Sequence, residues 1–248
     1  MLETLRTARG VMRSLGIYYG WRQRGRSLAM DALYARFVKS GDLVFDIGAH
    51  VGDRVAAFRR LGAKVVAVEP QRALNFVIGM MFSRDDRVII ERVAVGRKIG
   101  DVRLMINTDN PTISTASNAF VHAAQDASGW QGQHWDKSIR VPMTTLDALI
   151  AEHGVPAFIK IDIEGFEEEA LMGLTQPVAA LSFEFTTIQR DVARACIKRC
   201  VALGMTLFNA AIGESQTLGD WRSAKAVDRW LDELPHEANS GDIYALRP

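Results

Sequence analysis

Short apolar segments alternate with amphipathic ones between about residues 40 and 95, and this alternation constrains the fold more than any other feature. Strands are predicted at Leu43–Ile47, Lys64–Val68 and Arg87–Val95, with helices at Arg54–Leu61 and Gln71–Met81. Buried strands joined through helices run parallel, and the helices then cover both faces of the sheet. The sequence therefore predicts a doubly wound α/β fold.

The same alternation returns in the second half of the chain. Helices are expected at Leu146–His153, Glu164–Leu174 and Asp191–Leu203, and strands at Ala157–Ile161 and Leu181–Phe185. Two further strands, Met205–Ala210 and Ile243–Leu246, are expected to form an antiparallel pair. Together these elements predict a mostly parallel, Rossmann-like sheet of seven strands.

Three stretches lie outside this alternation. Residues 1–40 are predicted to form a basic helical arm, and residues 41–248 the main domain. Within that domain, residues 107–138 and 212–240 are expected to be insertions that cover the site or contact the substrate, because long loops are uncommon in compact domains. The insertions contain four tryptophans, which either stack on a sugar ring or close small apolar cores. They are Trp130, Trp135, Trp221 and Trp230.

The charge of the chain is unevenly distributed. The whole chain carries a formal charge of only +1, from 30 basic and 29 acidic residues, so its charge balance indicates no nucleic-acid partner. The arm differs, because it has eight basic residues and two acidic ones, a local charge of +6. We interpret the arm as a solvated helix face, and peripheral contact with an anionic membrane surface is the alternative.

The two cysteines, Cys196 and Cys200, lie on one face of a predicted helix without a nearby histidine. This spacing indicates buried, reduced thiols rather than a metal site or a disulfide scaffold. The chain has no continuous apolar segment typical of a signal peptide, and no apolar run of the roughly 20 residues that a membrane span requires. We therefore predict a cytoplasmic protein.

A glycine-containing loop follows the first predicted strand, which ends with Asp46. The loop contains Gly48, Ala49, His50 and Gly52, so it lacks the middle glycine of the dinucleotide pattern G-x-G-x-x-G. A carboxylate at the strand end would repel a pyrophosphate. S-adenosylmethionine (SAM) has no phosphate and carries an ammonium group, so the loop favours SAM over NAD.

Glu69 ends the second predicted strand and is followed by Pro70. The carboxyl ends of parallel strands form the ligand-binding edge of such sheets, and an acid at this place can bind ribose hydroxyls. Glu69 therefore predicts a nucleoside, although this residue alone does not separate SAM from NAD.

A second cluster of charged residues surrounds the end of the strand predicted at Ala157–Ile161. Lys160 and Asp162 lie on the same side of the strand because side chains alternate, and Glu164 follows at the same edge. We expect Asp162 and Glu164 in the site. The three acids at 167–169 fall in the first helical turn, where they complement the helix dipole.

With these segments in place, the sequence resembles the FkbM family of SAM-dependent methyltransferases. The matching segments are Val44–Asp53, Val66–Pro70, Val93–Gly96, Val141–Asp147, Ile159–Glu167, Ala170–Leu174 and Ser182–Phe185. The resemblance implies a class I SAM methyltransferase fold and methylation, usually of a hydroxyl on a sugar or natural product. It implies cofactor contacts from Asp46, Gly48, Ala49, His50, Gly52, Glu69, Pro70, Ala94 and Asp162. Glu91 departs from the family pattern, which has Asn there.

Methyl transfer to a hydroxyl requires alignment and a base. Asp162 or Glu164 is the expected base, with a pKa raised by burial, and Lys160 is a second catalytic candidate that would stabilise an alkoxide. A divalent metal held by Asp162, Glu164 and Glu184 is possible, but we expect none. The expected product of the cofactor is S-adenosylhomocysteine, and the expected partner is a small hydroxylated acceptor such as a saccharide.

Three other functions remain open from the sequence. An NAD-dependent oxidoreductase is disfavoured by the loop. A non-catalytic binding protein on the same fold would not need all four acids Asp46, Glu69, Asp162 and Glu164. An RNA methyltransferase has support only from the basic arm. The sequence specifies neither the acceptor nor an oligomeric state, and it does not separate O- from N-methylation.

Overall fold

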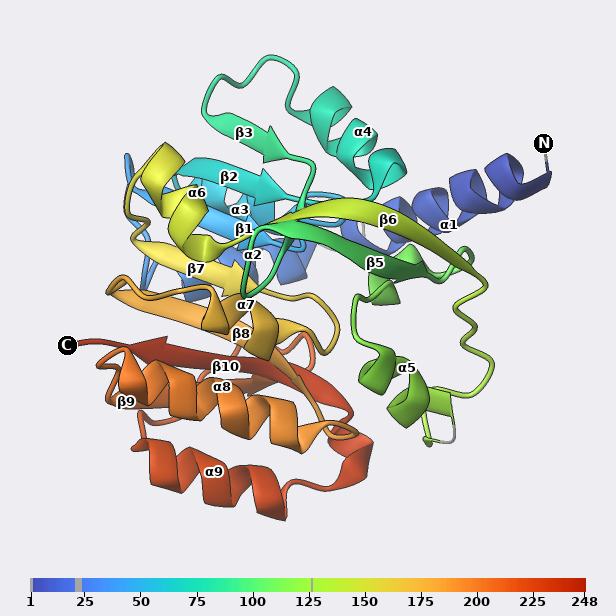
Figure 1. Cartoon of the computed structure of the whole chain (residues 1–248). Coiled ribbons are helices and arrows are strands. Elements are labelled where there is room, and N and C mark those ends of the chain that lie inside the picture. Colours follow the sequence, from blue (N-terminus) through green and yellow to red (C-terminus); the bar gives the residue numbers. More distant parts are fainter. Residues whose placement is uncertain (1, 21–23, 126) are drawn as a thin grey trace.

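The computed structural model describes residues 2–20, 24–125 and 127–248, and its centre is a twisted sheet of seven strands (Figure 1). The strand order is β3 (Val88–Glu91), β2 (Lys64–Val68), β1 (Leu43–Ile47), β7 (Phe158–Ile161), β8 (Ala180–Thr186), β10 (Ser240–Leu246) and β9 (Leu207–Ile212). The first five strands are parallel, and β10 runs antiparallel to both β8 and β9. The predicted α/β fold with a mostly parallel, seven-stranded sheet is confirmed.

Helices cover both faces of this sheet, as the alternation of side chains on β1 requires. Val44 points into one core and Phe45 and Ile47 into the other. The core around Phe45 is completed by helices α6 (Leu146–His153), α7 (Glu167–Met172), α8 (Arg190–Ala202) and α9 (Ala224–Glu233). The core around Val44 is completed by α2 (Arg24–Tyr34), α3 (Asp53–Arg60) and α4 (Arg72–Met81).

The N-terminal residues contribute to both packing and site. Helix α1 (Leu2–Tyr19) packs on α4 through Val11 and Leu15, which contact Leu74 and Val77. Helix α2 buries Met30, Leu33 and Tyr34 in the core around Val44. The arm is thus tied to the main sheet by apolar contacts.

A second, smaller sheet joins β4 (Ala94–Val95), β6 (Lys137–Thr144) and β5 (Gly100–Ile106). The prediction of one strand over Arg87–Val95 was wrong, because the chain leaves the main sheet after Glu91 and pairs Ala94 with Met143 of β6. Both halves are apolar, so the sequence does not mark this change of sheet. Figure 1 shows that β5 and β6 extend beyond the main sheet toward α1.

The two expected insertions carry short helices and aromatic clusters. Residues 107–138 contain the 3₁₀ turn η2 (Pro111–Ile113) and helix α5 (Asn118–Gln125). All four tryptophans close apolar clusters, the second of the two alternatives. Trp130 and Trp135 contact Phe120, Trp221 contacts Phe37, and Trp230 contacts Phe185.

The structure also bears on the thiols and on membrane spans. Cys196 and Cys200 are buried and unbridged, as expected. Among the described residues, no helix combines the length and the apolar character needed to cross a bilayer.

Candidate active site

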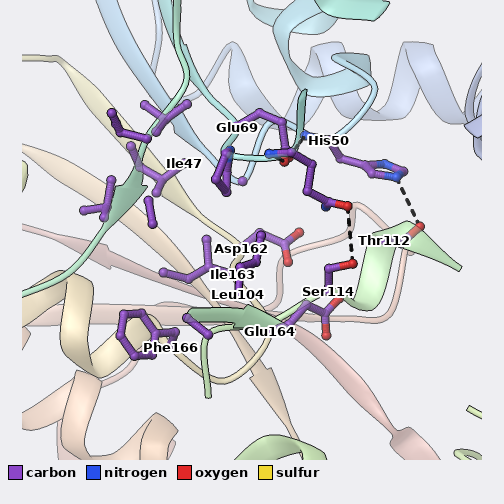
Figure 2. A pocket seen from close by; sticks show the side chains of 18 residues that line it. Ile47, His50, Glu69, Leu104, Thr112, Ser114, Asp162, Ile163, Glu164 and Phe166 are labelled. Atoms are coloured by element: carbon purple, nitrogen blue, oxygen red, sulfur yellow. Dashed lines mark hydrogen bonds between the residues drawn. The ribbon is translucent and has the colours of Figure 1, made fainter. Parts of the chain in front are cut away.

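Two adjoining pockets open at the carboxyl ends of β1, β2 and β7. We name them the apolar pocket and the polar pocket, after the side chains that predominate in each. The apolar pocket is lined by Ile47, Gly48, His50, Val68, Glu69, Pro70, Gln71, Val93, Ala94, Val95, Leu104, Thr112, Ser114, Ala116, Asp162, Ile163, Glu164 and Phe166 (Figure 2). The polar pocket is lined by Tyr18, Asp46, Gly48, Ala49, His50, Asp53, Arg54, Thr112, Lys160, Asp162 and Glu214. Four residues, Gly48, His50, Thr112 and Asp162, line both pockets.

Gly48 brings the first loop against the strand that carries the second acid cluster. Its φ is +87°, and a Cβ atom would lie 1.8 Å from the carbonyl oxygen of Asp162. Only glycine fits this close approach. The Gly48 and Ala49 amides donate hydrogen bonds to the Val68 carbonyl at 2.9 and 3.0 Å, which fixes the loop against β2.

Gly52 differs from the other predicted loop residues, because it lines neither pocket. It precedes α3 with a φ of +80°, and a Cβ atom there would lie 3.1 Å from the Phe82 ring. The structure therefore gives Gly52 a role in starting the helix.

Asp46 lies at the end of β1 in the wall of the polar pocket, with 1% of its surface exposed. Its Oδ2 atom is buried and has no hydrogen-bond partner among the described residues. Burial raises the pKa of Asp46 to about 7, although Lys160 lies nearby and opposes this shift. An unpartnered buried carboxyl oxygen is costly, which indicates a ligand group at this place.

Glu69 ends β2 in the wall of the apolar pocket, close to Pro70 and Ala94. Its Oε2 accepts a hydrogen bond from the His50 amide at 3.1 Å, and its Oε1 accepts one from the Gln71 amide at 2.8 Å. Burial nevertheless raises the pKa of Glu69 to about 8. The carboxyl group is thus held in one orientation toward the pocket.

His50 lies between the two pockets with a φ of +48°. Its Nε2 is 3.3 Å from the Thr112 hydroxyl (Figure 2). Its ring meets the edge of the Tyr18 ring at 5.4 Å between centroids. Burial lowers the pKa of His50 to about 4, so the ring is neutral near pH 7.

Lys160 lies on β7 between two carboxylates, and its side chain is 1% exposed. Its Nζ is 2.8 Å from Asp162 Oδ2 and 3.4 Å from Asp242 Oδ1, on β10. Burial opposes ionisation of Asp162, but Lys160 and then Arg54 hold its pKa below the ordinary value. Asp162, which lines both pockets, is therefore an ionised carboxylate.

Glu164 lies two residues beyond Asp162, with a φ of +57° and 7% exposure. Within the described part of the chain, no group donates a hydrogen bond to its carboxylate. Burial, together with the charges of Asp162 and Glu167, raises the pKa of Glu164 well above its ordinary value. The pKa of Asp162 is thus lowered and that of its neighbour Glu164 is raised, a contrast typical of acid–base pairs in enzymes.

Glu184 joins this pair from β8. One carboxylate oxygen from each of Asp162, Glu164 and Glu184 lies within 4.8 Å of the other two, a geometry that could hold a metal ion. Burial also raises the pKa of Glu184 well above its ordinary value. Glu184 lines neither the apolar nor the polar pocket.

Sequence reasoning missed the ion network of the polar pocket. Arg54 pairs with Asp53 at 2.6 Å and with Glu214 at 2.8 Å, and Arg26 from α2 pairs with the same two acids. Arg54 is 8% exposed, and its Nε is buried without a hydrogen-bond partner among the described residues. No local motif marks this network, because its members come from three distant segments.

The insertion at 107–138 supplies the remaining wall of the apolar pocket. Ser114 donates to the Gln71 side chain at 3.4 Å (Figure 2). The Thr115 hydroxyl donates to the Glu164 carbonyl at 2.6 Å. These contacts come from a short run of hydroxyl residues, Thr112, Ser114, Thr115 and Ser117. Glu91 lies outside the pocket, with its carboxylate 3.2 Å from His153 Nε2.

The family model of the methyltransferase FkbM domain matches residues 46–236, which is most of the chain. The protein belongs to the FkbM methyltransferase family. The match includes Asp46, Glu69, Asp162 and Glu164, and it ends before β10. No curated protein matches this chain significantly in sequence.

Solved structures similar to this FkbM-family methyltransferase are remote in sequence. A TehB-like SAM-dependent methyltransferase from Corynebacterium glutamicum has 12% identity and a TM-score of 0.45, with 94% of this chain and 99% of that chain covered. Aeropyrum pernix fibrillarin with bound SAM has 10% identity and a TM-score of 0.46, covering 88% and 74%. A precorrin-6y C5,15-methyltransferase from Geobacter metallireducens has 10% identity and a TM-score of 0.42, covering 90% and 87%.

Proposed function

We propose that this FkbM-family methyltransferase transfers the methyl group of SAM to a hydroxyl of a small acceptor, such as a saccharide. The observation that carries the proposal is the pair of carboxyl groups just beyond β7, where Asp162 Oδ2 lies 2.8 Å from Lys160 Nζ and Glu164 is buried with a raised pKa. Both line the apolar pocket. A cytoplasmic location is part of the proposal, and the two reduced thiols support it.

The donor set of the two pockets fits SAM. The unpartnered Asp46 Oδ2 can accept from the ammonium group of its methionine part, and the unpartnered Arg54 Nε can donate to the carboxylate. Glu69 would bind the ribose hydroxyls from the apolar pocket, where Val93, Ala94 and Phe166 offer apolar surface to the base.

SAM, when bound, supplies an electrophilic methyl group. Glu164 takes the proton of the acceptor hydroxyl, because its raised pKa makes its carboxylate form a stronger base than an ordinary carboxylate. Asp162 accepts a hydrogen bond that orients the acceptor. Lys160 acts through Asp162, because its ammonium is held in two ion pairs and keeps that carboxylate ionised.

The test begins with calorimetric titration of the protein with S-adenosylhomocysteine and, separately, with NAD. We expect binding of S-adenosylhomocysteine and none of NAD. Asp46→Asn and Glu69→Gln should each weaken binding tenfold or more, whereas Asp86→Asn, an exposed acid on the β3 side, is the matched control. Binding of NAD alone would overturn the choice of cofactor.

The acceptor is then sought with methyl-labelled SAM and a panel of saccharides and other hydroxylated compounds. Transfer of the labelled methyl group to an oxygen atom of the acceptor, together with loss of this transfer in Glu164→Gln, supports the proposal. Transfer to nitrogen, or salt-sensitive labelling of RNA, would replace the acceptor class. Cofactor binding without transfer to any compound, including water, would favour a binding protein on the same fold.

A further inference from the structure

We infer that the exposed faces of α1 and α4 form a docking surface for a bilayer that contains anionic lipids. The inference does not depend on the proposed acceptor. The surface is defined by four apolar side chains and three arginines on the two helices. They are Leu5, Arg9, Met12, Arg13, Arg72, Phe76 and Met80.

The apolar members are among the most exposed apolar side chains of the described chain. The exposed fractions of Leu5, Met12, Phe76 and Met80 are 62%, 67%, 65% and 63%. Among the described residues, only Leu28 and Ile99 of the large apolar side chains are also more than 60% exposed. A concentration of such side chains on two neighbouring helices indicates an interaction surface.

The two helices are neighbours. Val11 and Leu15 of α1 belong to one apolar cluster with Leu74 and Val77 of α4. The four exposed apolar side chains belong to the solvent-exposed faces of these two neighbouring helices. Figure 1 shows both helices together on the side of the molecule opposite α9.

An open groove adjoins Phe76 on α4. It has a volume of about 430 Å³ and lies between α1, α4 and the β5–β6 pair. Phe76 and Ala73 form one wall, and Ile106 and Ile139 form another. The groove gives an inserted apolar group further apolar contacts below the level of Phe76.

The exposed arginines of the two helices favour an anionic partner. Arg9 and Arg13 are exposed and form no ion pair with a described residue, and Arg72 is exposed at the start of α4. Helix α4 contains no acidic residue. Apolar side chains beside arginines on a helix surface match the boundary of an anionic bilayer, where apolar groups enter the acyl region and arginines contact lipid phosphates.

The test is co-sedimentation of the full chain with two kinds of vesicle. One contains phosphatidylcholine only, and the other also contains phosphatidylglycerol. We expect binding to the anionic vesicles that weakens as salt is raised, and no binding to the neutral ones. Arg9→Gln with Arg13→Gln should weaken binding by about tenfold or more, since one arginine near such a surface contributes about a factor of five.

Phe76→Ser with Met80→Ser removes the apolar half and should weaken binding by about tenfold or more. Two matched pairs on the other side of the molecule should leave binding unchanged. Lys225→Gln with Arg229→Gln removes two charges on α9, and Met172→Ser with Val201→Ser removes two half-exposed apolar groups.

Three results of the vesicle experiments would overturn the inference. They are absence of binding to anionic vesicles, equal loss of binding in the control pairs, and loss of binding in the arginine pair without any loss in the Phe76–Met80 pair. The last result would mean electrostatic adsorption without insertion. The protein could also dimerise in a concentration-dependent way in the absence of lipid. If Phe76→Ser with Met80→Ser abolished this dimerisation, the surface would be assigned to a second copy of this chain instead. Thermal unfolding of each variant checks that the fold is retained.

Discussion

The apolar and polar pockets differ in the charges that surround their carboxyl groups, and the pKa values of these groups differ accordingly. In the apolar pocket, Glu69 and Glu164 form no ion pair with a described residue, and burial raises the pKa of both. In the polar pocket, Asp53 and Glu214 pair with Arg26 and Arg54, which hold both pKa values below the ordinary range although desolvation opposes this. The pKa of a carboxyl group is therefore raised on one side of the site and lowered on the other.

This difference divides the chemistry that the site can perform. Groups that hold protons can exchange them with a hydroxyl, whereas fixed charges can bind a zwitterion. Asp162 belongs to both pockets and lies next to Lys160. Asp46 is the exception in the polar pocket, because burial raises its pKa to about 7 and its Oδ2 has no hydrogen-bond partner among the described residues.

The largest effect is expected from Glu164→Gln, which removes the proposed base from the apolar pocket. Turnover should fall by about 10²–10⁴-fold, the range of general base catalysis. A base must lose its proton first, so the wild-type rate should fall as the pH falls through the raised pKa of Glu164. The variant should lack this acidic limb in a pH–rate profile. The exposed Glu152→Gln is the control, and full turnover in Glu164→Gln would exclude the role.

The next effect concerns stability on the polar side. Lys160→Met leaves Asp162 and Asp242 buried without their shared cation. Breaking a buried ion pair in this way costs about 3–5 kcal/mol in the free energy of unfolding. Denaturant unfolding measures it, and Lys64→Met, at an exposed position of β2, should change little. Equal stability of both variants would show that the two carboxyls take up protons at little cost.

The two pockets also differ in how far the sequence predicts them. The residues of the apolar pocket that follow strand ends, such as Gly48 and Glu69, were predicted at one edge because parallel strands end together. The loop motif and its strand are adjacent in the sequence, so periodicity and spacing carry this information. Gly52 shows where prediction from spacing ends. Its spacing from Gly48 is typical of a ligand-binding loop, but in the structure it is the residue before helix α3.

The polar pocket could not be predicted in this way. Arg54 and Glu214 are separated by 160 residues, and Tyr18 comes from the arm. Their meeting depends on how α2 and the β9–α9 connection pack on the first loop, which no local pattern encodes. The change from the main sheet to the second sheet after Glu91 also depends on a distant contact, because β4 pairs with β6, about 50 residues later in the sequence.

A smaller effect is expected from Arg54→Gln. Gln keeps a donor but loses the charge that would bind the cofactor carboxylate. A hydrogen bond between charged groups contributes about 1.5–3 kcal/mol, so affinity for S-adenosylhomocysteine should fall by about 10–100-fold. Calorimetry measures this, with the exposed Arg36→Gln as the control. Unchanged affinity would move the cofactor carboxylate away from Arg54 and leave that residue a purely structural part of the network.

The smallest effect is expected from removal of divalent metal. Asp162, Glu164 and Glu184 bring oxygens within 4.8 Å, as a metal site would. Two other features already offset their charge, since Lys160 lies 2.8 Å from Asp162 and the raised pKa values of Glu164 and Glu184 disfavour their charged forms. Dialysis against a chelator should therefore leave turnover and melting temperature unchanged, and added Mg²⁺ should change turnover less than about twofold. The opposite outcome is a loss of turnover after dialysis that Mg²⁺ restores in the wild type but not in Glu184→Gln. That outcome would place a metal at this cluster, and the acceptor hydroxyl would then lose its proton with the help of that metal.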